Sequence, residues 1–383
     1  MLFDSSSVAV ASSIGRCQAH MLAPMSDDTR TSEDAPEGLR TVEDHADGTD
    51  YGLEPLRPLD LGTIHSFSDL LEGMKDTAFG GRQLGEAADV LVDMVEDPDC
   101  LVVGTFTGAM TVAKQGLLLC DMIDRGMLDV VVSTGALMAH GFVEAAGLHH
   151  FKHRPDMDDQ QLYHAGFDRV YDTLELEKNL DDVELIFRSA MSEWPDEVTA
   201  CSYRIHRRLG QWLAENTTGR GVLRSAFEQN VPVFVPAYTD SELGLDFAIL
   251  NRLRRMKDLP PIPFDPFLDL EHYTSTVLGK ERLGIFTVGG GVPRNWAQQV
   301  GPFLDIIGKR GAGEGAVRRF QYGVRICPEP VHWGGLSGCT YSEGVSWGKF
   351  VPPREGGRFA EVPADATVAW PLLLAGVLER LER

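Results

Sequence analysis

Five short runs of mainly β-branched and apolar residues constrain the fold of this chain most. They lie at 101–103, 130–132, 231–235, 284–288 and 322–326, and each of the first four leads through small residues into a helical pattern. The predicted helices end at about Arg125 after the first run and about Met256 after the third, and one begins near Asn295 after the fourth. Such alternation is typical of an α/β fold with a doubly wound, mostly parallel sheet and helices on both faces.

Small residues occupy four of the predicted strand ends, at 104–108, 133–135, 236–240 and 289–291. In a doubly wound sheet, ligands bind beyond the carboxyl ends of the strands, where helix N-termini offer free N–H groups and glycines admit a pyrophosphate. The pattern therefore indicates a dinucleotide site, although tight strand-to-helix turns without a ligand use the same residues. The G-x-G-x-x-G fingerprint is absent from all four turns, which excludes an ordinary dinucleotide-binding fold.

Charge and composition exclude several classes of protein. The formal net charge is −22, so we expect no nucleic-acid partner, because the phosphates would be repelled. No run approaches the roughly 18 apolar residues of a membrane span, so we expect no membrane partner either. The six cysteines are scattered without a C-x-x-C pair, which argues against a zinc ribbon or a disulfide framework and favours a reducing, cytoplasmic location.

The first 50 residues differ in composition from the rest of the chain. They are rich in Ser, Thr, Asp and Glu and have no hydrophobic periodicity. Such a segment buries too little apolar surface to offset the entropy of ordering. We therefore predict a flexible acidic tail over 1–50 and one folded domain over 51–383.

The densest chemical signal is HWGGLSGCTYSEGVSWGK at 332–349. Lys349 follows Trp347 by two residues on a glycine-rich stretch, so it can lie partly desolvated against an indole face. Desolvation disfavours the ammonium form of a lysine, lowers its pKa and frees the amine to form imines. On spacing alone, a surface lysine beside a core tryptophan is the simpler interpretation. Glu343 can hold a cationic substrate or stabilise a helix N-terminus.

These residues carry a family resemblance. GVSWGK at 344–349 closely resembles the lysine motif of the deoxyhypusine synthase family. Other segments resemble the family's landmarks in the same order: LDVVVSTG at 128–135, PAYTD at 236–240, VGGGV at 288–292, ADA at 364–366 and WPLL at 370–373. The resemblance covers roughly residues 55–383. It implies a Rossmann-like, NAD-binding catalytic domain and a homotetramer whose active sites are shared between subunits.

The resemblance also implies a reaction. In the family, NAD oxidises spermidine to an imine, and the active lysine captures the four-carbon aminobutyl unit as a covalent imine. The unit then passes to an acceptor amine, and the retained hydride reduces the new imine. A secondary amine has no good leaving group until hydride removal creates an electrophilic carbon, and the lysine then divides one difficult exchange into two imine transfers.

Position by position, the resemblance gives roles to single residues. Lys349 is implied to be the imine-forming nucleophile, Trp347 the apolar wall along the amine chain and Glu343 an anionic contact. The residues implied to line NAD are Thr107, Thr111, Ser133, Thr134, Gly135, Asp240, Gly290, Asp365 and Ala366. Asp240 follows a strand and can accept a hydrogen bond from a ribose hydroxyl, while capping the next helix is an alternative or additional role.

Departures from the family pattern fall on polar contacts. Ala139 and His140 stand where the family has two adjacent glutamates, and Leu245 and Leu336 stand where it has two polyamine-binding aspartates. The substrate-binding candidates besides Trp347 and Glu343 are Asp246, which neighbours Leu245, Asn295, which replaces a family histidine, and Ser337. His140 can accept a proton near neutral pH in place of the lost glutamate, or it is a structural histidine.

HWGGLSG, together with GGGVPRN at 289–295, resembles the bacterial deoxyhypusine synthase-like branch. This favours a small cationic amine as the acceptor, such as putrescine, which would give homospermidine. True deoxyhypusine synthesis on a protein lysine and a catalytically silent, NAD-binding paralogue are the alternatives. His140, His149, His150 and His153 indicate a histidine-rich surface loop more than a metal site, so no metal is predicted.

Overall fold

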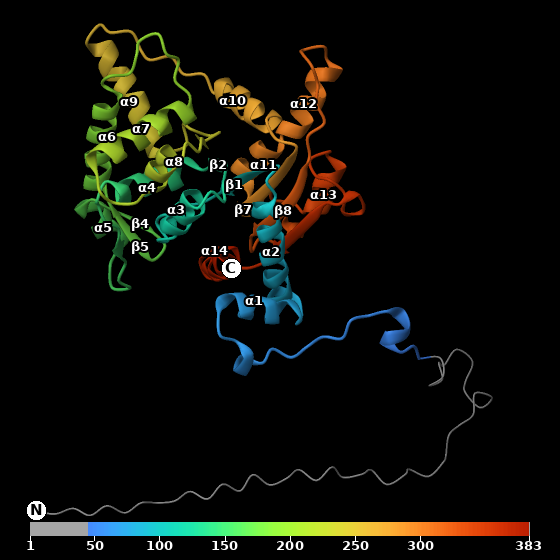
Figure 1. The fold of residues 1–383 in the computed structure, drawn as a ribbon. Helices are drawn as coiled ribbons and strands as arrows, with labels where there is room; N and C mark the ends of the chain where they lie inside the picture. The colour runs from blue at the N-terminus through green and yellow to red at the C-terminus, as the bar shows by residue number, and fades with distance from the viewer. Residues whose placement is uncertain (1–44, 383) are drawn as a thin grey trace, which may run out of the picture. The chain divides into compact units, whose positions relative to one another are not determined.

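The computed structural model describes residues 45–382 (Figure 1). The chain divides into two units, residues 1–55 and 56–383. In the described part of the first unit, Gly48–Tyr51 forms a 3-10 turn (η3) that Asp47 caps by accepting a hydrogen bond from the Thr49 N–H. Most of the tail predicted over 1–50 lies outside the described residues, and its flexibility stays a prediction.

The second unit is built on a six-stranded, fully parallel sheet in the order β6-β2-β1-β7-β8-β9. Its strands are β1 (Cys100–Phe106), β2 (Val130–Ser133), β6 (Val233–Phe234), β7 (Arg282–Val288), β8 (Phe320–Ile326) and β9 (Arg358–Val362). All five predicted strands are present. The prediction missed β9, because its sequence RFAEV carries two charged residues among five and no continuous apolar run.

Side chains alternate along the strands and build a core on each face of the sheet. Val131 points into one core, and its neighbours Val130 and Val132 point into the other. The first core includes helices α2 (Phe79–Glu96), α3 (Gly116–Asp124) and α14 (Ala366–Leu381), and the second includes α10 (Phe267–Leu278), α11 (Gly291–Gln298), α12 (Val300–Lys309) and α13 (Tyr341–Ser346). The predicted doubly wound α/β fold is therefore confirmed.

A group of helices lies at the end of the sheet that β2 and β6 form (Figure 1). It contains α4 (Gly135–Ala145), α6 (Glu177–Met191), α7 (Ser202–Asn216), α8 (Val222–Glu228) and α9 (Glu242–Met256). Helix α1 (Phe67–Lys75) packs on α2 and α14 instead. Three further 3-10 turns are η4 (Leu61–Thr63), η5 (Val331–Trp333) and η6 (Pro353–Glu355). No helix in the described part of the chain is long and apolar enough to span a membrane.

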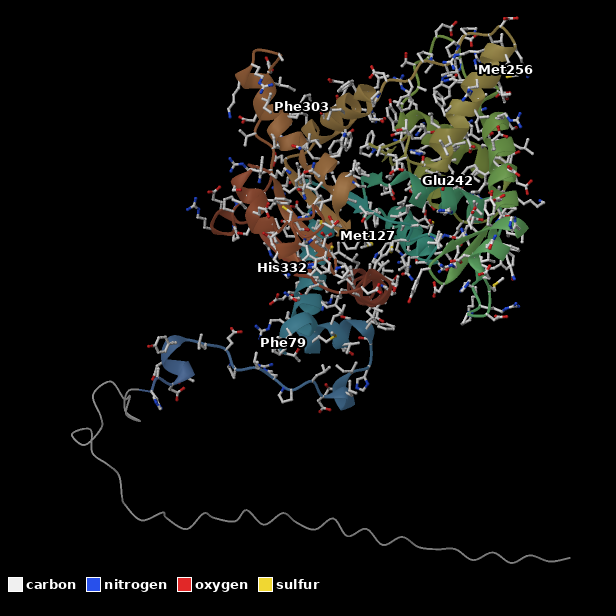
Figure 2. The ribbon with its side chains drawn as sticks, turned by 180° about the vertical axis from the view of Figure 1, so that it is seen from behind. Phe79, Met127, Glu242, Met256, Phe303 and His332 are labelled. Carbon is white, nitrogen blue, oxygen red and sulfur yellow. The ribbon has the colours of Figure 1, made fainter. Side chains whose placement is uncertain are left out.

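The predicted C-terminal ends of two helices match the structure more closely than the predicted start of a third helix does. Helix α9 ends at Met256 as expected, and Figure 2 labels Glu242 and Met256 at its two ends. Helix α3 ends one residue before the predicted Arg125. The helix predicted to begin near Asn295 begins at Gly291 instead. Gly290 is its N-cap, so the last of the three glycines belongs to the helix and not to the turn before it.

A small antiparallel sheet between α4 and α6 was not predicted. It consists of β3 (Phe151–Lys152), β5 (Thr173–Leu176) and β4 (Phe167–Val170) in that spatial order, with helix α5 (Asp159–Ala165) preceding β4. Its strands are two to four residues long, too short to give a clear alternating pattern. Strand β5 matters for the site, because it carries the buried Glu175.

Two glycines of α2 test how tightly this helix packs against α1. A Cβ at Gly85 would lie 2.5 Å from the Leu71 carbonyl oxygen, whereas a Cβ at Gly80 meets nothing within 4 Å. We expect Gly85→Ala to lower the free energy of unfolding by about 2 kcal/mol, because backbone must move to admit the methyl group. Gly80→Ala should leave stability unchanged or raise it by less than about 1 kcal/mol. Urea denaturation of both variants measures the difference, and equal effects would contradict this packing.

Candidate active site

The residues predicted to bind a cofactor gather at one edge of the sheet. Because all six strands are parallel, their carboxyl ends meet there. Thr107 and Thr111 follow β1, Ser133 ends β2, Thr134 and Gly135 start α4, Asp240 lies between β6 and α9, Gly290 lies between β7 and α11, and Asp365 and Ala366 start α14 after β9. The structure thus brings residues from five strand ends into one region.

Glycines allow close contacts at the centre of this edge. The Thr107 hydroxyl donates to the Val288 carbonyl at 3.1 Å and accepts from the Gly290 N–H at 3.0 Å. A Cβ at Gly289 would lie 1.8 Å from Thr107 Oγ1, and one at Gly290 would lie 2.5 Å from Ser337 Cα. The glycines therefore draw the loop after β1 and the segment that carries Ser337 onto the end of β7.

Two helix N-termini at this edge keep their N–H groups free of side-chain caps. Helices α4 and α11 have no capping side chain, whereas Ser241 caps α9 and Asp365 caps α14. The Ser133 hydroxyl is buried and has no hydrogen-bond partner among the described residues. Free N–H groups and an unpaired hydroxyl are what a dinucleotide pyrophosphate requires, so the residues present fit NAD.

The capping role that we considered for Asp240 is wrong. Ser241 is the N-cap of α9, and its hydroxyl accepts from the Gly244 N–H at 3.1 Å. The exposed Asp240 precedes that cap, so its carboxylate is available to a ribose hydroxyl.

Lys349 lies in the wall of a pocket of about 480 Å³. Its side chain is 9% exposed, and Nζ donates to Asn295 Oδ1 at 3.0 Å. Nζ also lies 5.9 Å from the centroid of the Trp347 ring, which is 66% exposed. The pocket brings together four predicted residues, Lys349, Trp347, Glu343 and Asn295, with Leu336, Cys339, Arg294, Gln298 and further side chains.

Local sequence explains how Lys349 is placed. Thr340 caps α13 by accepting from the Glu343 N–H at 3.1 Å, so Glu343 stands in the first turn of that helix. At the other end of α13, the Lys349 N–H donates to the Gly344 carbonyl at 3.1 Å, and the Lys349 carbonyl accepts from the Phe320 N–H of β8 at 2.9 Å. The backbone of Lys349 is thus bound to both a helix and the sheet.

Two arginines hold the glycine-rich segment that forms the pocket rim. The Cys339 carbonyl accepts hydrogen bonds from Arg294 and from Arg325, each at 2.7 Å. Arg325 also pairs with Glu361 of β9, whose other oxygen accepts from the Tyr341 N–H at 2.7 Å. These charged contacts are more than nine-tenths buried at both arginines, so they fix a segment that is otherwise rich in glycine.

Burial lowers the pKa of Lys349. Desolvation is the largest cause, and the nearby charge of Arg294 acts in the same direction, while Cys339 and Glu343 oppose it. A lysine that is held in an apolar wall and bound to a neutral amide carries a larger fraction of free amine than an exposed one. The interpretation as a surface lysine is therefore wrong.

His140 lies inside α4, where it is 7% exposed. Its Nδ1 lies 3.1 Å from Glu175 Oε2, and its Nε2 lies 3.9 Å from Oε1 of Glu242, which is labelled in Figure 2. His150 Nε2 lies 2.5 Å from the same Glu175 oxygen. The predicted surface loop of histidines is therefore wrong for His140 and His150, because the folded chain brings the distant Glu175 between them.

Asp246 is not among the residues that line the Lys349 pocket in this chain. It is 8% exposed on α9, and burial together with the charges of Glu184 and Glu242 raises its pKa to about 7, while Arg188 opposes this. Its neighbour Leu245 is 60% exposed on the same helix, and a substrate contact of Asp246 stays a prediction. Of the predicted substrate residues, Asp246 and Ser337 do not line the Lys349 pocket within this chain, and neither does His140.

Sequence reasoning missed Glu175 and Glu242. Glu175 stands 35 residues from His140, on a four-residue strand of the insertion, so no local spacing connects the two. Glu242 is the first residue of α9, where a carboxylate has an ordinary role at a helix start. The one sequence feature that pointed to Glu242 was its position two residues after Asp240, a predicted cofactor residue.

Comparison with known proteins shows the family of this chain. The family model for deoxyhypusine synthase matches residues 69–377. The chain belongs to the deoxyhypusine synthase family. It is 33% identical over 327 residues to a probable deoxyhypusine synthase 2 of Methanosarcina acetivorans, covering 85% of this chain and 90% of that protein. It is 31% identical over 325 residues to a deoxyhypusine synthase-like protein of Chlorobaculum tepidum, covering 84% and 88%.

The fold agrees as well. A crystal structure of a deoxyhypusine synthase from Entamoeba histolytica superposes with a TM-score of 0.54 at 14% identity, covering 85% of this chain and 97% of that one. The family resemblance read from the motifs is thus confirmed, and the relatives include a bacterial deoxyhypusine synthase-like protein. Family membership supports a transferase in general terms.

The raised pKa of Asp246 predicts how stability changes with pH. A carboxyl group whose pKa is higher in the folded state contributes stability below its ordinary pKa of 3.8, and this contribution is lost as the pH rises through about 7. We expect Asp246→Asn to raise the free energy of unfolding at pH 8 by up to about 4 kcal/mol and to have little effect at pH 4. The exposed Asp181→Asn on α6 is the control. An equal effect of Asp246→Asn at both pH values would contradict the assignment.

Proposed function

We propose that this chain is a cytoplasmic, NAD-dependent aminobutyl transferase. It moves the four-carbon amine unit of spermidine, or of a related amine, through an imine on Lys349 to an amine acceptor. The acceptor is a small polyamine, so that the product is of the homospermidine type. The observation that carries this proposal is the desolvated Lys349 amine, held at the pocket wall between Asn295 and Trp347.

The environment of Lys349 suits a nucleophile. Burial lowers its pKa, which raises the fraction of neutral amine near neutral pH. Its hydrogen bond to Asn295 points the amine along the pocket, and a neutral amide does not hold the proton as a carboxylate would. The free amine then attacks the oxidised carbon of the donor, and the three-carbon diamine leaves.

The carboxyl edge of the sheet supports the choice of NAD. The uncapped N-termini of α4 and α11 and the unpartnered Ser133 hydroxyl would hold the pyrophosphate, and the exposed Asp240 would bind a ribose hydroxyl. Bound NAD supplies the acceptor for a hydride from the carbon next to the donor's secondary nitrogen. Thr107 fixes the turn at Gly290 against the loop after β1, so that both sides of the cofactor site keep their shape.

His140 is proposed to accept a proton before the hydride leaves. A protonated amine cannot release a hydride, because the nitrogen lone pair that stabilises the new C=N bond is occupied by the proton. A neutral imidazole carries a free nitrogen lone pair and can take this proton. Glu242, at 3.9 Å from His140 Nε2, adds a negative charge that attracts an ammonium group to the same place.

Pocket chemistry favours small amines. Within the described residues of this chain, the Lys349 pocket has apolar walls, including Leu336 and Ile306, and Glu343 is the one carboxylate among its lining residues. An extended polyamine with several ammonium groups needs an anionic partner for each of them, whereas a four-carbon diamine needs fewer. This argument places putrescine ahead of a protein lysine as the acceptor.

A homotetramer with shared active sites completes the proposal. Trp347, Leu336 and Leu245 are 66%, 54% and 60% exposed, and Trp333 is 71% exposed. Trp347 and Leu336 also line the Lys349 pocket, and exposed apolar side chains of this kind are typical of a surface that another subunit covers. A second subunit can then bring its His140 and Asp240 to the Lys349 of the first.

A reductive trapping experiment tests the proposal. The purified protein is incubated with NAD and spermidine, reduced with borohydride and examined by peptide mass spectrometry. We expect a mass gain of one aminobutyl unit on Lys349, because borohydride reduces a lysine imine to a stable amine. Lys349→Ala should lose the adduct, and Lys309→Ala, at an exposed lysine of α12, should retain it.

Absence of the adduct in the wild-type protein with NAD bound would overturn the spermidine donor. Where the adduct forms, putrescine added to the wild-type protein before any borohydride tests the acceptor, and homospermidine is the expected product. An unreduced imine that passes its aminobutyl unit to a protein lysine, but to no small amine, would favour deoxyhypusine synthesis instead.

A further inference from the structure

A row of charged and polar groups runs behind His140, from the exposed Lys114 to the buried Glu175. Lys114 pairs with Glu144 and lies 3.0 Å from His150 Nδ1. His150 Nε2 lies 2.5 Å from Glu175 Oε2, and the same oxygen lies 3.1 Å from His140 Nδ1. His140, His150 and Glu175 are each less than one-tenth exposed, so the contacts among these three form away from bulk water.

The neighbours of His150 determine where its proton lies. When the imidazole is neutral, the Lys114 ammonium donates to Nδ1, and the proton must be on Nε2. When it is charged, both nitrogens carry protons, and Nδ1 faces Glu144 at 3.7 Å. In both states Nε2–H faces Glu175. Burial disfavours the charged form, but Glu144 and Glu175 outweigh it and raise the pKa of His150.

Glu175 is surrounded by donors. Its Oε1 accepts from Asn179 Nδ2 at 2.8 Å and from the Leu176 N–H at 3.0 Å, and its Oε2 faces the two histidines. Burial alone would raise its pKa, but His140, His150 and Asn179 outweigh burial and hold the pKa of Glu175 well below its usual range. An ionised carboxylate accepts hydrogen bonds only, so His140 must donate to it through Nδ1–H.

We propose that Glu175 is a positioning residue that, with His150, fixes His140 as the Nδ1–H tautomer and leaves its Nε2 lone pair free to accept a proton. This inference rests on the proposed function only in the use made of that lone pair. The tautomer itself follows from the donors and acceptors around the ring. In a carboxylate–histidine pair of this kind, the carboxylate of Glu175 orients the imidazole of His140, which acts as the base.

The row also contacts the loop that carries predicted cofactor residues. Thr111 and Lys114 belong to the loop after β1, and a Cβ at Gly141, next to His140, would lie 3.0 Å from Thr111 Cγ2. Lys114 has a φ of 62°, which is uncommon for a residue other than glycine. The ion pair of Lys114 with Glu144 therefore connects the loop after β1 to the row behind His140.

The other side of His140 is anionic. Glu242 on α9 faces Nε2 at 3.9 Å, and Asp246 lies one turn further along that helix near Glu184 and Arg188 of α6. An amine proton that His140 accepts would therefore be stabilised by carboxylates on both sides of the ring. The pH dependence of the reaction belongs to this whole group and not to His140 alone.

His140, His150 and Glu175 also have the chemistry of metal ligands, and their ligand atoms lie within 4.8 Å of one another. A metal would need a lone pair on His150 Nε2. The Lys114 ammonium at 3.0 Å from Nδ1 favours the opposite tautomer, with the proton on Nε2. The contacts thus favour a row without a metal, in which His150 Nε2 carries the proton, and metal content is part of the test.

The test compares Glu175→Gln and Glu175→Asp with the wild-type protein and with Glu177→Gln, a control at an exposed glutamate two residues away. Nitrogen-15 NMR of labelled histidine reports the tautomer of His140, whose signals are assigned by their loss in His140→Gln. We expect a protonated Nδ1 in the wild type and a mixture of tautomers in Glu175→Gln, because an amide can donate as well as accept.

For turnover we expect Glu175→Gln to lower kcat about 100-fold with KM changed less than threefold. Glu175→Asp, which keeps the charge and guards against a folding defect, should restore part of the rate and the wild-type tautomer. Glu177→Gln should match the wild type in both measurements.

Three results would overturn the inference: a wild-type His140 with its proton on Nε2, a tautomer that Glu175→Gln leaves unchanged, or stoichiometric bound zinc that Glu175→Gln loses. Failure of the proposed function would look different. The wild type would then form no Lys349 adduct, while the NMR spectra would still test the tautomer by themselves.

Discussion

Parallel pairing of β1 with both of its neighbours is the constraint on which the site depends. β1 pairs with β2 on one side and with β7 on the other, and all three strands run in the same direction. Their carboxyl ends therefore meet, and the turns that follow them bring Thr107, Ser133 and Gly290 to one edge. Had any of these strands been antiparallel, its turn would lie at the far edge, and no dinucleotide could contact all three.

Lys349 depends on a second, more local constraint. It follows a glycine-rich segment that has few side chains of its own to pack, and the buried Arg294 and Arg325 hold that segment through the Cys339 carbonyl. Arg294 and Cys339 line the same pocket as Lys349, and burial is the largest cause of the lowered pKa of this lysine. A change at either arginine should therefore reach Lys349 through the segment that they hold.

Local sequence predicted the parts of this structure that local patterns encode. Local patterns identified the lysine motif at 344–349 and the strands β1, β2, β6, β7 and β8, because each is a short run of characteristic residues. The row behind His140 could not, because Glu175 reaches His140 from a four-residue strand, and Asp246 turned inward although it neighbours the exposed Leu245. Contacts between segments that are far apart in the sequence depend on how insertions pack, and hydrophobic periodicity does not encode this packing.

The central claim is that burial makes Lys349 a reactive amine, and its pKa is the most direct measure of this. Lysines can be dimethylated with carbon-13 formaldehyde and followed by NMR across a pH titration, with Lys349→Arg identifying the signal. We predict that Lys349 titrates below the ordinary lysine pKa of 10.5 and below exposed lysines such as Lys309. A Lys349 signal that titrates together with the exposed lysines would contradict the account.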